Sequence, residues 1–291
     1  MYYSPFRYPG GKGKIAPFVS LLIEKSGIND CTYVEPFAGG AGVALYLLFE
    51  KKVSNIVIND FDKAIYSAWK AILEETDRFM ELVSCVPITL DEWKHQKEIY
   101  INNNKHYSFE LGFAAFYLNR TNRSGILSAG PIGGYDQKGK YLIDARFNRD
   151  ALIDKIRSIK EQRSHIHLYN KDIVNFISSY LPKYQDRAFI YFDPPYYHKG
   201  EELYRNFFTA KDHSNLAKQI SKLKCRWMVT YDDVDEIREI YSHYDCKRFD
   251  LTYSLANSGK KSEIMFLSDT DLWPTKREMN SHKININLRK R

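Results

Sequence analysis

Five short apolar runs divide the chain and are separated by segments of helical character. They occupy residues 31–34, 55–60, 165–172, 188–193 and 226–233, and all but the first end at or near an aspartate. Apolar strands that alternate with helices are typical of a parallel sheet with crossover helices. Ligands of such sheets bind at the carboxyl ends of the strands. The pattern therefore predicts an α/β fold with its functional site beside these aspartates.

A long interval without a further strand pattern separates the second run from the third. Thr89 and Glu92 form a capping-box pattern there, and Ser108 precedes a largely apolar segment as its expected N-cap. Residues 121–148 are rich in Gly, Arg, Lys and Tyr, which predicts a loop with a hairpin. We expect three parts: a catalytic domain formed by 1–62 and 165–275, a helical domain inserted at about 63–164, and a basic, poorly packed tail at 276–291.

The segment VEPFAGGAG, residues 34–42, places a glycine-rich turn between the first strand and a helix. Gly39 and Gly40 let a ligand approach the backbone closely. Glu35 precedes this turn, and Asp60 ends the next strand, where an acid commonly binds a ribose hydroxyl pair. Two acids without a dedicated phosphate cradle favour a positively charged nucleoside as the ligand, although either acid alone could simply cap a helix. Residues 39–44, GGAGVA, lack the GxGxxG pattern and disfavour an NAD-dependent enzyme.

The N-terminal segment FRYPGGKGK, residues 6–14, does not fit a phosphate-binding P-loop. Tyr8 stands where the first glycine is needed, and Ile15 follows Lys14 in place of Ser or Thr. What remains is a Gly-Gly turn with Lys12 near the aromatic ring of Tyr8. Such a turn could hold a carboxylate and stack on a ring, or it could be a surface turn with a solvated lysine.

The segment DPPY, residues 193–196, ends the fourth apolar run in an unusual way. Pro194 and Pro195 remove two backbone donors and fix φ, and Pro194 also keeps Asp193 out of the helical region. The stiff turn presents a carboxylate, carbonyl acceptors and the aromatic face of Tyr196. An exocyclic amine on a flat base has two hydrogens to donate and a face for stacking. We therefore favour a binding site for such a base over a proline-rich turn with no ligand.

The overall composition agrees with a nucleic-acid partner without requiring one. The net charge is +7, and 15% of the residues are aromatic, including 22 tyrosines. Basic charge attracts polyanions, and aromatic faces stack on bases. A basic enzyme with an aromatic core has the same composition, so composition alone does not decide between the two.

The cysteines and the hydropathy pattern predict a cytoplasmic protein. Cys31, Cys85, Cys225 and Cys246 are scattered and form no CxxC pair, so neither a zinc site nor a disulfide framework is expected. No N-terminal apolar segment precedes a cleavage site, and no apolar run approaches the length of a membrane span.

Three motifs in this order resemble those of the Dam-like DNA adenine-N6 methyltransferases, the D12 class or alpha group. They are FRYPGGKGK at 6–14, EPFAGGAG at 35–42 and DPPY at 193–196, and the resemblance extends to NRTNRSG at 119–125, KDI at 171–173 and NFFTAKDHSNLA at 206–217. It covers most of the chain, to about residue 270. It implies a Rossmann-like, S-adenosylmethionine-dependent methyltransferase sheet with an inserted, mainly helical target-recognition domain.

The resemblance also implies a role for each matched residue. The expected contacts of S-adenosylmethionine are Tyr8, Lys12, Glu35, Pro36, Phe37, Gly39, Gly40, Asp60, Asp172, Ile173 and Asp193. The expected catalytic set around the target base is Asp193, Pro194, Pro195 and Tyr196. The chain departs from close relatives in having Tyr-Pro at 8–9, where Trp-Ala is frequent, and NRTNRSG in place of the more usual Asn-Arg-Thr…Phe-Asn-Gly.

The implied reaction needs a base that has left the duplex, because a protein-bound methyl group cannot reach adenine N6 inside the stack. Asp193 and the Pro194 carbonyl would each accept one N6 hydrogen bond and aim the nitrogen lone pair. Tyr196 would stack on the base. The methyl group would move by in-line displacement, with positioning supplying most of the catalysis and with no metal.

The inserted domain is expected to contact double-stranded DNA. Arg120 and Arg123 are candidates for guanine edges or phosphates, and Asn122 is a candidate for adenine. Lys138 and Lys140 flank Gly139 and are candidates for phosphate contacts. Each of these charges could instead be an ordinary solvated surface residue.

Two alternatives stay open at this point. Cytosine N4 offers the same amine geometry, so N4-cytosine methylation is possible on the same site. A DNA-binding relative without catalytic activity could keep the fold. A cognate restriction enzyme is a further possible partner, and we expect a monomer or a weak dimer.

Overall fold

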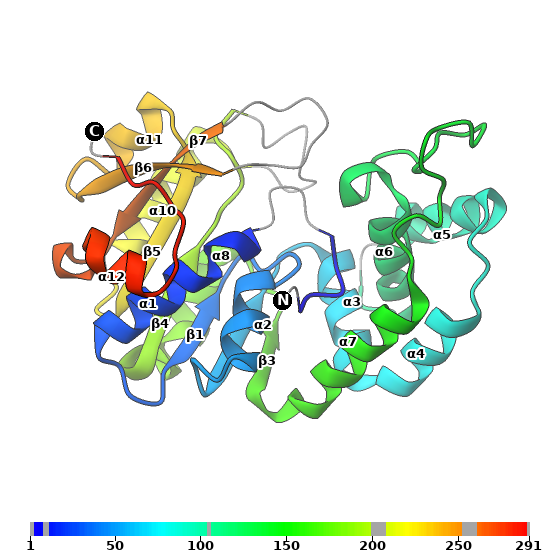
Figure 1. Ribbon diagram of the computed structural model, residues 1–291, viewed down its shortest axis with the longest axis horizontal. Coiled ribbons are helices and arrows are strands. Elements are labelled where there is room, and N and C mark those ends of the chain that lie inside the picture. Colours follow the sequence, from blue (N-terminus) through cyan, green and yellow to red (C-terminus); the bar gives the residue numbers. More distant parts are fainter. Residues whose placement is uncertain (1–2, 8–11, 104–105, 199–207, 252–260, 290–291) are drawn as a thin grey trace.

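The computed structural model describes residues 3–7, 12–103, 106–198, 208–251 and 261–289. Two bodies are visible in Figure 1, a layered α/β body and a helical body beside its β3 edge. The first helix of the helical body follows β2, and its last helix leads into β3.

The centre of the α/β body is a seven-stranded sheet in the order β3-β2-β1-β4-β5-β7-β6. The strands are β1 (Thr32–Glu35), β2 (Asn55–Asn59), β3 (Ile166–Tyr169), β4 (Ala188–Phe192), β5 (Arg226–Asp232), β6 (Cys246–Leu251) and β7 (Lys261–Leu267). Strands β1 to β5 are parallel, whereas β7 runs antiparallel to both β5 and β6. The predicted α/β sheet is confirmed, and each of the five apolar runs forms one of its parallel strands. Strands β1 and β4 lie side by side where the strand order reverses, which is where such sheets bind ligands.

Helices cover both faces of the sheet because successive strand residues point to opposite sides. In β1, Tyr33 packs in the apolar cluster that contains α1 (Ala16–Ser26) and α2 (Gly42–Phe49). Its neighbour Val34 packs in the opposite cluster, with α10 (Ala210–Ile220) and α11 (Asp235–Ile240). Burial of each such large apolar side chain contributes about 1.5–3 kcal/mol. The sheet is therefore a rigid middle layer that fixes the positions of its strand ends.

The helical body is built around one almost completely buried helix. Its helices are α3 (Lys63–Glu74), α4 (Thr76–Cys85), α5 (Leu90–Asn102), α6 (Phe109–Thr121) and α7 (Arg149–Glu161). Helix α6 buries eleven of its thirteen residues and begins at the expected cap, since Ser108 Oγ accepts from the Leu111 amide at 3.0 Å. Thr89 likewise caps α5 through the Glu92 amide. None of the helices in the described ranges is long and apolar enough to cross a membrane.

The contact between α3 and α6 depends on Gly112, and we expect Gly112→Ala to destabilise the protein. A Cβ atom at residue 112 would lie 2.4 Å from the backbone carbonyl oxygen of Ser67, so a helix backbone would have to move. Overpacking of this kind costs about 1–3 kcal/mol, even though alanine is the better helix former. Urea unfolding measures the loss. The exposed Glu98→Ala on α5 is the control and should change the free energy of unfolding by less than about 0.5 kcal/mol. An unchanged unfolding midpoint for Gly112→Ala would contradict the close packing.

The hairpin expected within residues 121–148 is wrong. The segment forms a 3-10 turn, Arg123–Gly125, an isolated bridge between Asn122 and Pro131, and then a series of turns. Gly133, Gly134 and Gln137 have positive φ angles that interrupt an extended path. The Gln137 side chain also hydrogen-bonds Ile132, Gly134 and Ile143 within the segment, replacing the ladder of a hairpin.

The expectation of a poorly packed C-terminal tail is also wrong over the described residues. Helix α12 (Lys276–Ser281) begins with a capping box between Thr275 and Glu278. Met279 and Ile284 are buried, and Lys25 of α1 pairs with Glu278 at 2.7 Å. Figure 1 shows this segment, in red, lying against α1 and β6. Its many charges misled the prediction because the few apolar residues among them are the ones that pack.

Candidate active site

Asp193 follows β4 and lies at the carboxyl edge of the sheet, half-buried, with 24% of its side chain exposed. Its two oxygens have different surroundings. Oδ1 accepts a hydrogen bond from Thr230 Oγ1 at 2.8 Å, and Lys12 Nζ lies 3.3 Å from the same atom. Tyr191 OH, in turn, lies 2.8 Å from Thr230 Oγ1. No residue of the described segments donates to Oδ2, so this oxygen can accept from a ligand.

Lys12 is the centre of a buried charge cluster. Its ammonium lies 2.8 and 2.7 Å from the two carboxylate oxygens of Glu263, a residue of β7. The side chains of Lys12 and Glu263 are 5% and 2% exposed. Burial opposes the charge on Lys12, but the carboxylates of Asp193 and Glu263 outweigh it and raise the pKa of Lys12 well above its usual value. Burial raises the pKa of Glu263, an effect that Lys12 opposes.

Tyr196 joins the same cluster through its hydroxyl. Tyr196 OH donates to Glu263 Oε1 at 2.9 Å, and Lys12 Nζ lies 5.5 Å from the centre of the Tyr196 ring. The ring is half-buried, whereas Pro194 and Pro195 before it are buried. The turn thus holds its carboxylate and its aromatic ring at fixed positions.

The two residues after Tyr196 have different surroundings. The Tyr197 amide donates to Asp232 Oδ1 at 3.0 Å, and its ring centre lies 5.0 Å from that of the buried His213. His198 is exposed, with Nε2 3.5 Å from Glu236 Oε1. Tyr197 therefore packs behind the turn.

The glycine-rich turn after β1 is held by side chains from several elements. Gly39 and Ala41 have positive φ angles of 45° and 47°. Trp69 Nε1 donates to the Gly39 carbonyl at 2.8 Å, and Ser4 Oγ donates to the Gly40 carbonyl at 2.5 Å. These contacts fix a backbone conformation that would otherwise be strained at Ala41.

Two acids border this turn, as the sequence predicted. Glu35 is buried, accepts from the Ala44 amide at 3.2 Å, and has a pKa raised well above its usual value by burial. Asp60 follows β2, and its Oδ2 and Oδ1 accept from the amides of Gly39 at 2.8 Å and Asp62 at 2.9 Å. Burial and the neighbouring charge of Asp62 raise the pKa of Asp60 to about 7. Each oxygen of Asp60 keeps a second lone pair for a ligand hydroxyl.

Asn59 ties three strand ends together, although the sequence reasoning missed it. Its Nδ2 donates to the carbonyls of Pro36 and Lys171, both at 3.0 Å, and its Oδ1 accepts from the Lys171 amide at 2.9 Å. The ends of β1, β2 and β3 are thereby held in one arrangement. The only signal in the sequence is the position of this polar residue at the end of an apolar run, NIVIN.

Three further cofactor candidates lie at the β3 end or outside the described residues. Asp172 is exposed and caps a short helix, α8 (Ile173–Asn175), by accepting from the Asn175 amide at 3.0 Å. Ile173 is half-buried. Phe61, which no motif marked, follows Asp60 and is 56% exposed. Tyr8 lies outside the described residues.

The DNA-contact candidates fall into two groups. Asn122 is fully buried; its amide accepts from Trp93 Nε1 and donates to the carbonyls of Ile126 and Leu127. Arg120 donates to the carbonyls of Pro5 and Arg146. These contacts favour a structural role for both residues, which hold the loop and the N-terminal segment.

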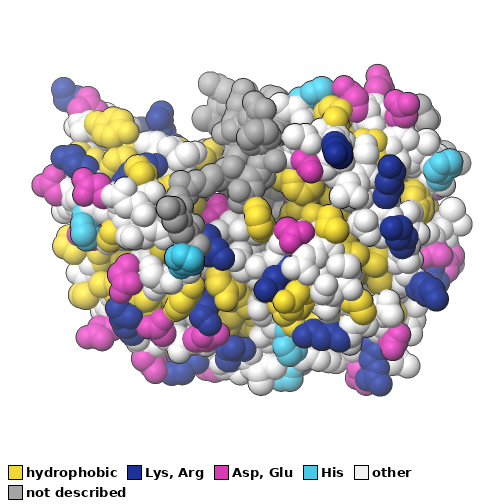
Figure 2. Space-filling model, turned by 180° about the vertical axis from the view of Figure 1, so that it is seen from behind, with side chains coloured by type: hydrophobic (Ala, Val, Ile, Leu, Met, Phe, Trp, Pro, Cys, Tyr) yellow, Lys and Arg dark blue, Asp and Glu magenta, His cyan; other side chains and the backbone are white. Residues whose placement is uncertain are grey.

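The other group is exposed and comprises Arg123, Lys138 and Lys140. The same loop exposes Tyr135 by 67% and Tyr141 by 56%. On the face seen in Figure 2, basic and acidic side chains are interspersed, with no large patch of one sign.

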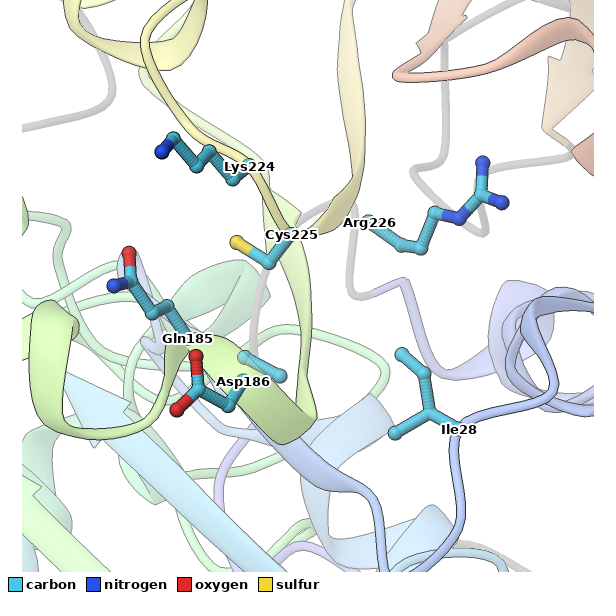
Figure 3. Close-up of a pocket in the computed structure, with 7 residues that line it drawn as sticks. Ile28, Gln185, Asp186, Lys224, Cys225 and Arg226 are labelled. Carbon is cyan, nitrogen blue, oxygen red and sulfur yellow. The ribbon is translucent and has the colours of Figure 1, made fainter.

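A separate pocket of about 240 Å³ lies at the opposite edge of the sheet, at the amino ends of β4 and β5 (Figure 3). Its lining includes Asp186, Lys224, Cys225 and Arg226. Burial raises the pKa of Cys225 to about 11, so its thiol is not an activated nucleophile. The pocket contains none of the predicted site residues.

Comparison with known proteins finds one family profile and several methyltransferases that are similar to this chain. The profile described as D12 class N6 adenine-specific DNA methyltransferase matches residues 8–255. The chain is 24% identical over 273 residues to the type II methyltransferase M.MjaIII of Methanocaldococcus jannaschii, covering 85% of this chain and 91% of that protein. It is 22% identical over 275 residues to the type II methyltransferase M1.LlaDCHI of Lactococcus lactis subsp. cremoris, covering 89% and 84%. Among solved structures, the rRNA methyltransferase aviRa of Streptomyces viridochromogenes aligns over 91% of this chain and 88% of its own, with 13% identity and a TM-score of 0.42.

The family match spans most of the chain, and the family is specific for adenine N6, which decides between the two amines left open by the sequence. The resemblance stated from the motifs is confirmed. The chain belongs to the D12 class N6 adenine-specific DNA methyltransferase family.

Proposed function

We propose a role for each group of site residues in the reaction of this family, the site-specific methylation of adenine N6 in DNA. The observation that carries the proposal is the asymmetry of Asp193. Its Oδ1 is held by Thr230 and Lys12, while its Oδ2 receives no hydrogen bond from the described residues. A carboxylate with one oxygen held by the protein and the other able to accept a hydrogen bond suits an amine whose nitrogen must be oriented toward the methyl group.

The target base is placed by the DPPY turn. Once the base has left the duplex, Asp193 Oδ2 accepts one N6 hydrogen and the Pro194 carbonyl accepts the other. Tyr196, whose hydroxyl is held by Glu263, supplies a face for the base to stack on. Because the acceptors are fixed before the base arrives, no reorganisation is needed during the reaction.

The family and the fold imply dependence on S-adenosylmethionine, which supplies an electrophilic methyl group on its sulfonium when bound. The donor set of the β1 and β2 ends fits this molecule. Asp60 has two lone pairs left for a ribose diol, and buried Glu35 suits a cationic group. Phe61 follows Asp60 in the chain, and its exposed ring offers a stacking face to the adenine ring of S-adenosylmethionine.

The other contacts of this molecule are proposed by position in the fold. The methionine part of S-adenosylmethionine would be surrounded by Pro36, Phe37, Gly39 and Gly40. Its adenine ring would lie near Asp172 and Ile173. The ends of β3, β2 and β1 would thus hold the methyl donor, and the end of β4 would hold the base. This division matches the strand order β3-β2-β1-β4.

Product analysis tests the proposed function. Purified protein is incubated with duplex DNA and radiolabelled S-adenosylmethionine, and the DNA is digested to nucleosides and analysed by mass. We expect N6-methyladenosine in its deoxy form. Label in N4-methylcytosine would reassign the target base, and absence of transfer to any tested duplex would point to a DNA-binding relative without activity.

The exposed loop between α6 and α7 is proposed to contact DNA. Lys138 and Lys140 would bind phosphates, with Arg123 and the exposed rings of Tyr135 and Tyr141 beside them. A cytoplasmic location, a cognate restriction enzyme as partner, and a monomeric or weakly dimeric state stay predictions.

The double variant Lys138→Ala with Lys140→Ala should weaken binding to all duplexes alike. Loss of two phosphate contacts should lower the slope of log K against log salt by about 2. Fluorescence anisotropy at a series of salt concentrations measures this slope. The matched control replaces Lys222 and Lys224, which are exposed with the same spacing at the opposite edge of the sheet. Equal slopes for the two double variants would show that the loop lysines do not contact phosphate.

A further inference from the structure

Glu263 is a buried carboxylate that no sequence motif marks. It lies on β7, an antiparallel strand, and reaches the active site from the side opposite the glycine-rich turn in the strand order. Its two oxygens contact Lys12, and one of them also accepts from Tyr196. A carboxylate that is 2% exposed is costly to bury, so its partners must account for its presence.

The cluster holds one cation between two anions. Lys12 Nζ has three hydrogens, and two of them face the oxygens of Glu263 at 2.7 and 2.8 Å. The remaining contact, to Asp193 Oδ1, is longer, at 3.3 Å. The ammonium is therefore bound mainly by Glu263 and touches Asp193 only on the side that also faces Thr230.

Loss of the charge on Glu263 would change this balance. A buried ammonium would keep Asp193 as its only anionic partner among the described residues, and the shortest way to satisfy it is to move toward that carboxylate. A lysine that spans both oxygens of Asp193 would occupy the acceptor that the target amine needs. The same change would remove the charged acceptor that holds the Tyr196 hydroxyl.

We propose that Glu263 is a positioning residue, which binds the Lys12 ammonium and the Tyr196 hydroxyl so that Asp193 keeps Oδ2 available for the adenine amine. The inference rests on the proposed role of Asp193. It assigns the antiparallel strand β7 a part in the active site. It also gives Lys12, an expected neighbour of the methyl donor, a second role as the cation between Glu263 and Asp193.

The first test is Glu263→Gln, which keeps the volume and one acceptor oxygen but removes the charge. Single-turnover methylation with saturating DNA and S-adenosylmethionine should slow about 10- to 100-fold. The dissociation constant for S-adenosylmethionine should stay within about 3-fold, because most proposed contacts of that molecule, at the ends of β1, β2 and β3, do not involve Glu263 or Lys12. Glu263→Asp, which restores the charge, should recover part of the rate. Glu239→Gln, at an exposed position of α11, is the control for loss of one negative charge.

A double-mutant cycle with Lys12→Met separates positioning from general packing. If Glu263 acts mainly through Lys12, the change Glu263→Gln should cost much less rate in the Lys12→Met background than in the unmodified protein, and the remaining loss reflects its contact with Tyr196. Additive losses, or a Glu263→Gln variant as fast as the unmodified protein, would overturn the inference. So would a parallel loss of rate, of methyl-donor affinity and of the unfolding temperature, which would mark Glu263 as a packing residue only.

Asp193→Ala, measured beside these variants, keeps the two proposals apart. If Asp193→Ala loses transfer while Glu263→Gln does not, only the role of Glu263 fails. If Asp193→Ala stays active, the proposed role of Asp193 itself fails.

Discussion

Replacement of Asp193 by alanine is expected to reduce methyl transfer by at least about 10³-fold while S-adenosylmethionine still binds. The loss has two physical sources. The target amine loses an acceptor that is fixed before it arrives, and removal of one such preorganised group typically costs 10²- to 10³-fold. Thr230 Oγ1 and Lys12 Nζ also lose the oxygen that they share, so their positions relax. Rapid-quench methylation and equilibrium binding of the methyl donor measure the two effects separately.

Asp193→Asn should fall between alanine and the unmodified protein. The amide has one acceptor oxygen. If that oxygen faces the base, the NH2 group faces the Lys12 ammonium, a donor against a donor. Asp186→Ala is the matched control, because this exposed aspartate lies before the other end of the same strand. Full activity of Asp193→Ala with a normal affinity for DNA would remove the carboxylate from the mechanism.

The parallel part of the fold could be predicted because its signal is local. Each of β1 to β5 is a short apolar run, and four of these runs end at or near an aspartate, so the strand ends and the acids were found together. Strand β6, CKRFDL, mixes charged and apolar residues as an edge strand does, and no motif precedes β7. The sequence reasoning therefore missed both antiparallel strands, and with them Glu263, whose importance arises only when β7 lies beside β5.

Two predicted DNA contacts, Arg120 and Asn122, stay predictions, although their packing favours a structural role. Asn122 and Arg120 lie in a polar segment typical of DNA contacts, but Asn122 faces inward to Trp93 and Arg120 donates to backbone carbonyls. A polar residue that reads DNA and one that holds a loop have the same chemistry. Only burial, which depends on how α5 packs against α6, distinguishes them.

The second large effect is expected at Asp60, where affinity for S-adenosylmethionine should depend on pH. The pKa of Asp60 in the free protein is raised to about 7 by burial and by the charge of Asp62. A ribose diol donates to the ionised form, so binding should tighten as the pH rises from about 6 to 8. The same raised pKa makes the stability of the free protein depend on pH, because the folded state binds the proton more tightly than the unfolded state. The stability from this proton is fully present below the unfolded pKa near 4 and is lost as the pH rises through about 7.

Asp60→Asn should weaken methyl-donor binding by about 30-fold or more at pH 8, and the pH dependence should disappear. The substitution would weaken the two hydrogen bonds from the ribose hydroxyls to the ionised carboxylate, which contribute about 1.5–3 kcal/mol each. Asparagine can also accept from only one of the Gly39 and Asp62 amides, which loosens the turn. Isothermal titration calorimetry between pH 6 and pH 8.5 measures both effects.

Asp62→Asn is the control that makes this prediction specific. Asn is as good an N-cap as Asp, so α3 should keep its cap through the Ala64 amide. Removal of the charge of Asp62 removes one of the two causes that raise the pKa of Asp60, so the pH at which binding tightens should move downward in this variant. An unchanged midpoint in Asp62→Asn, or a pH dependence that survives in Asp60→Asn, would assign the titration to another group, of which buried Glu35 is the nearest candidate by chemistry.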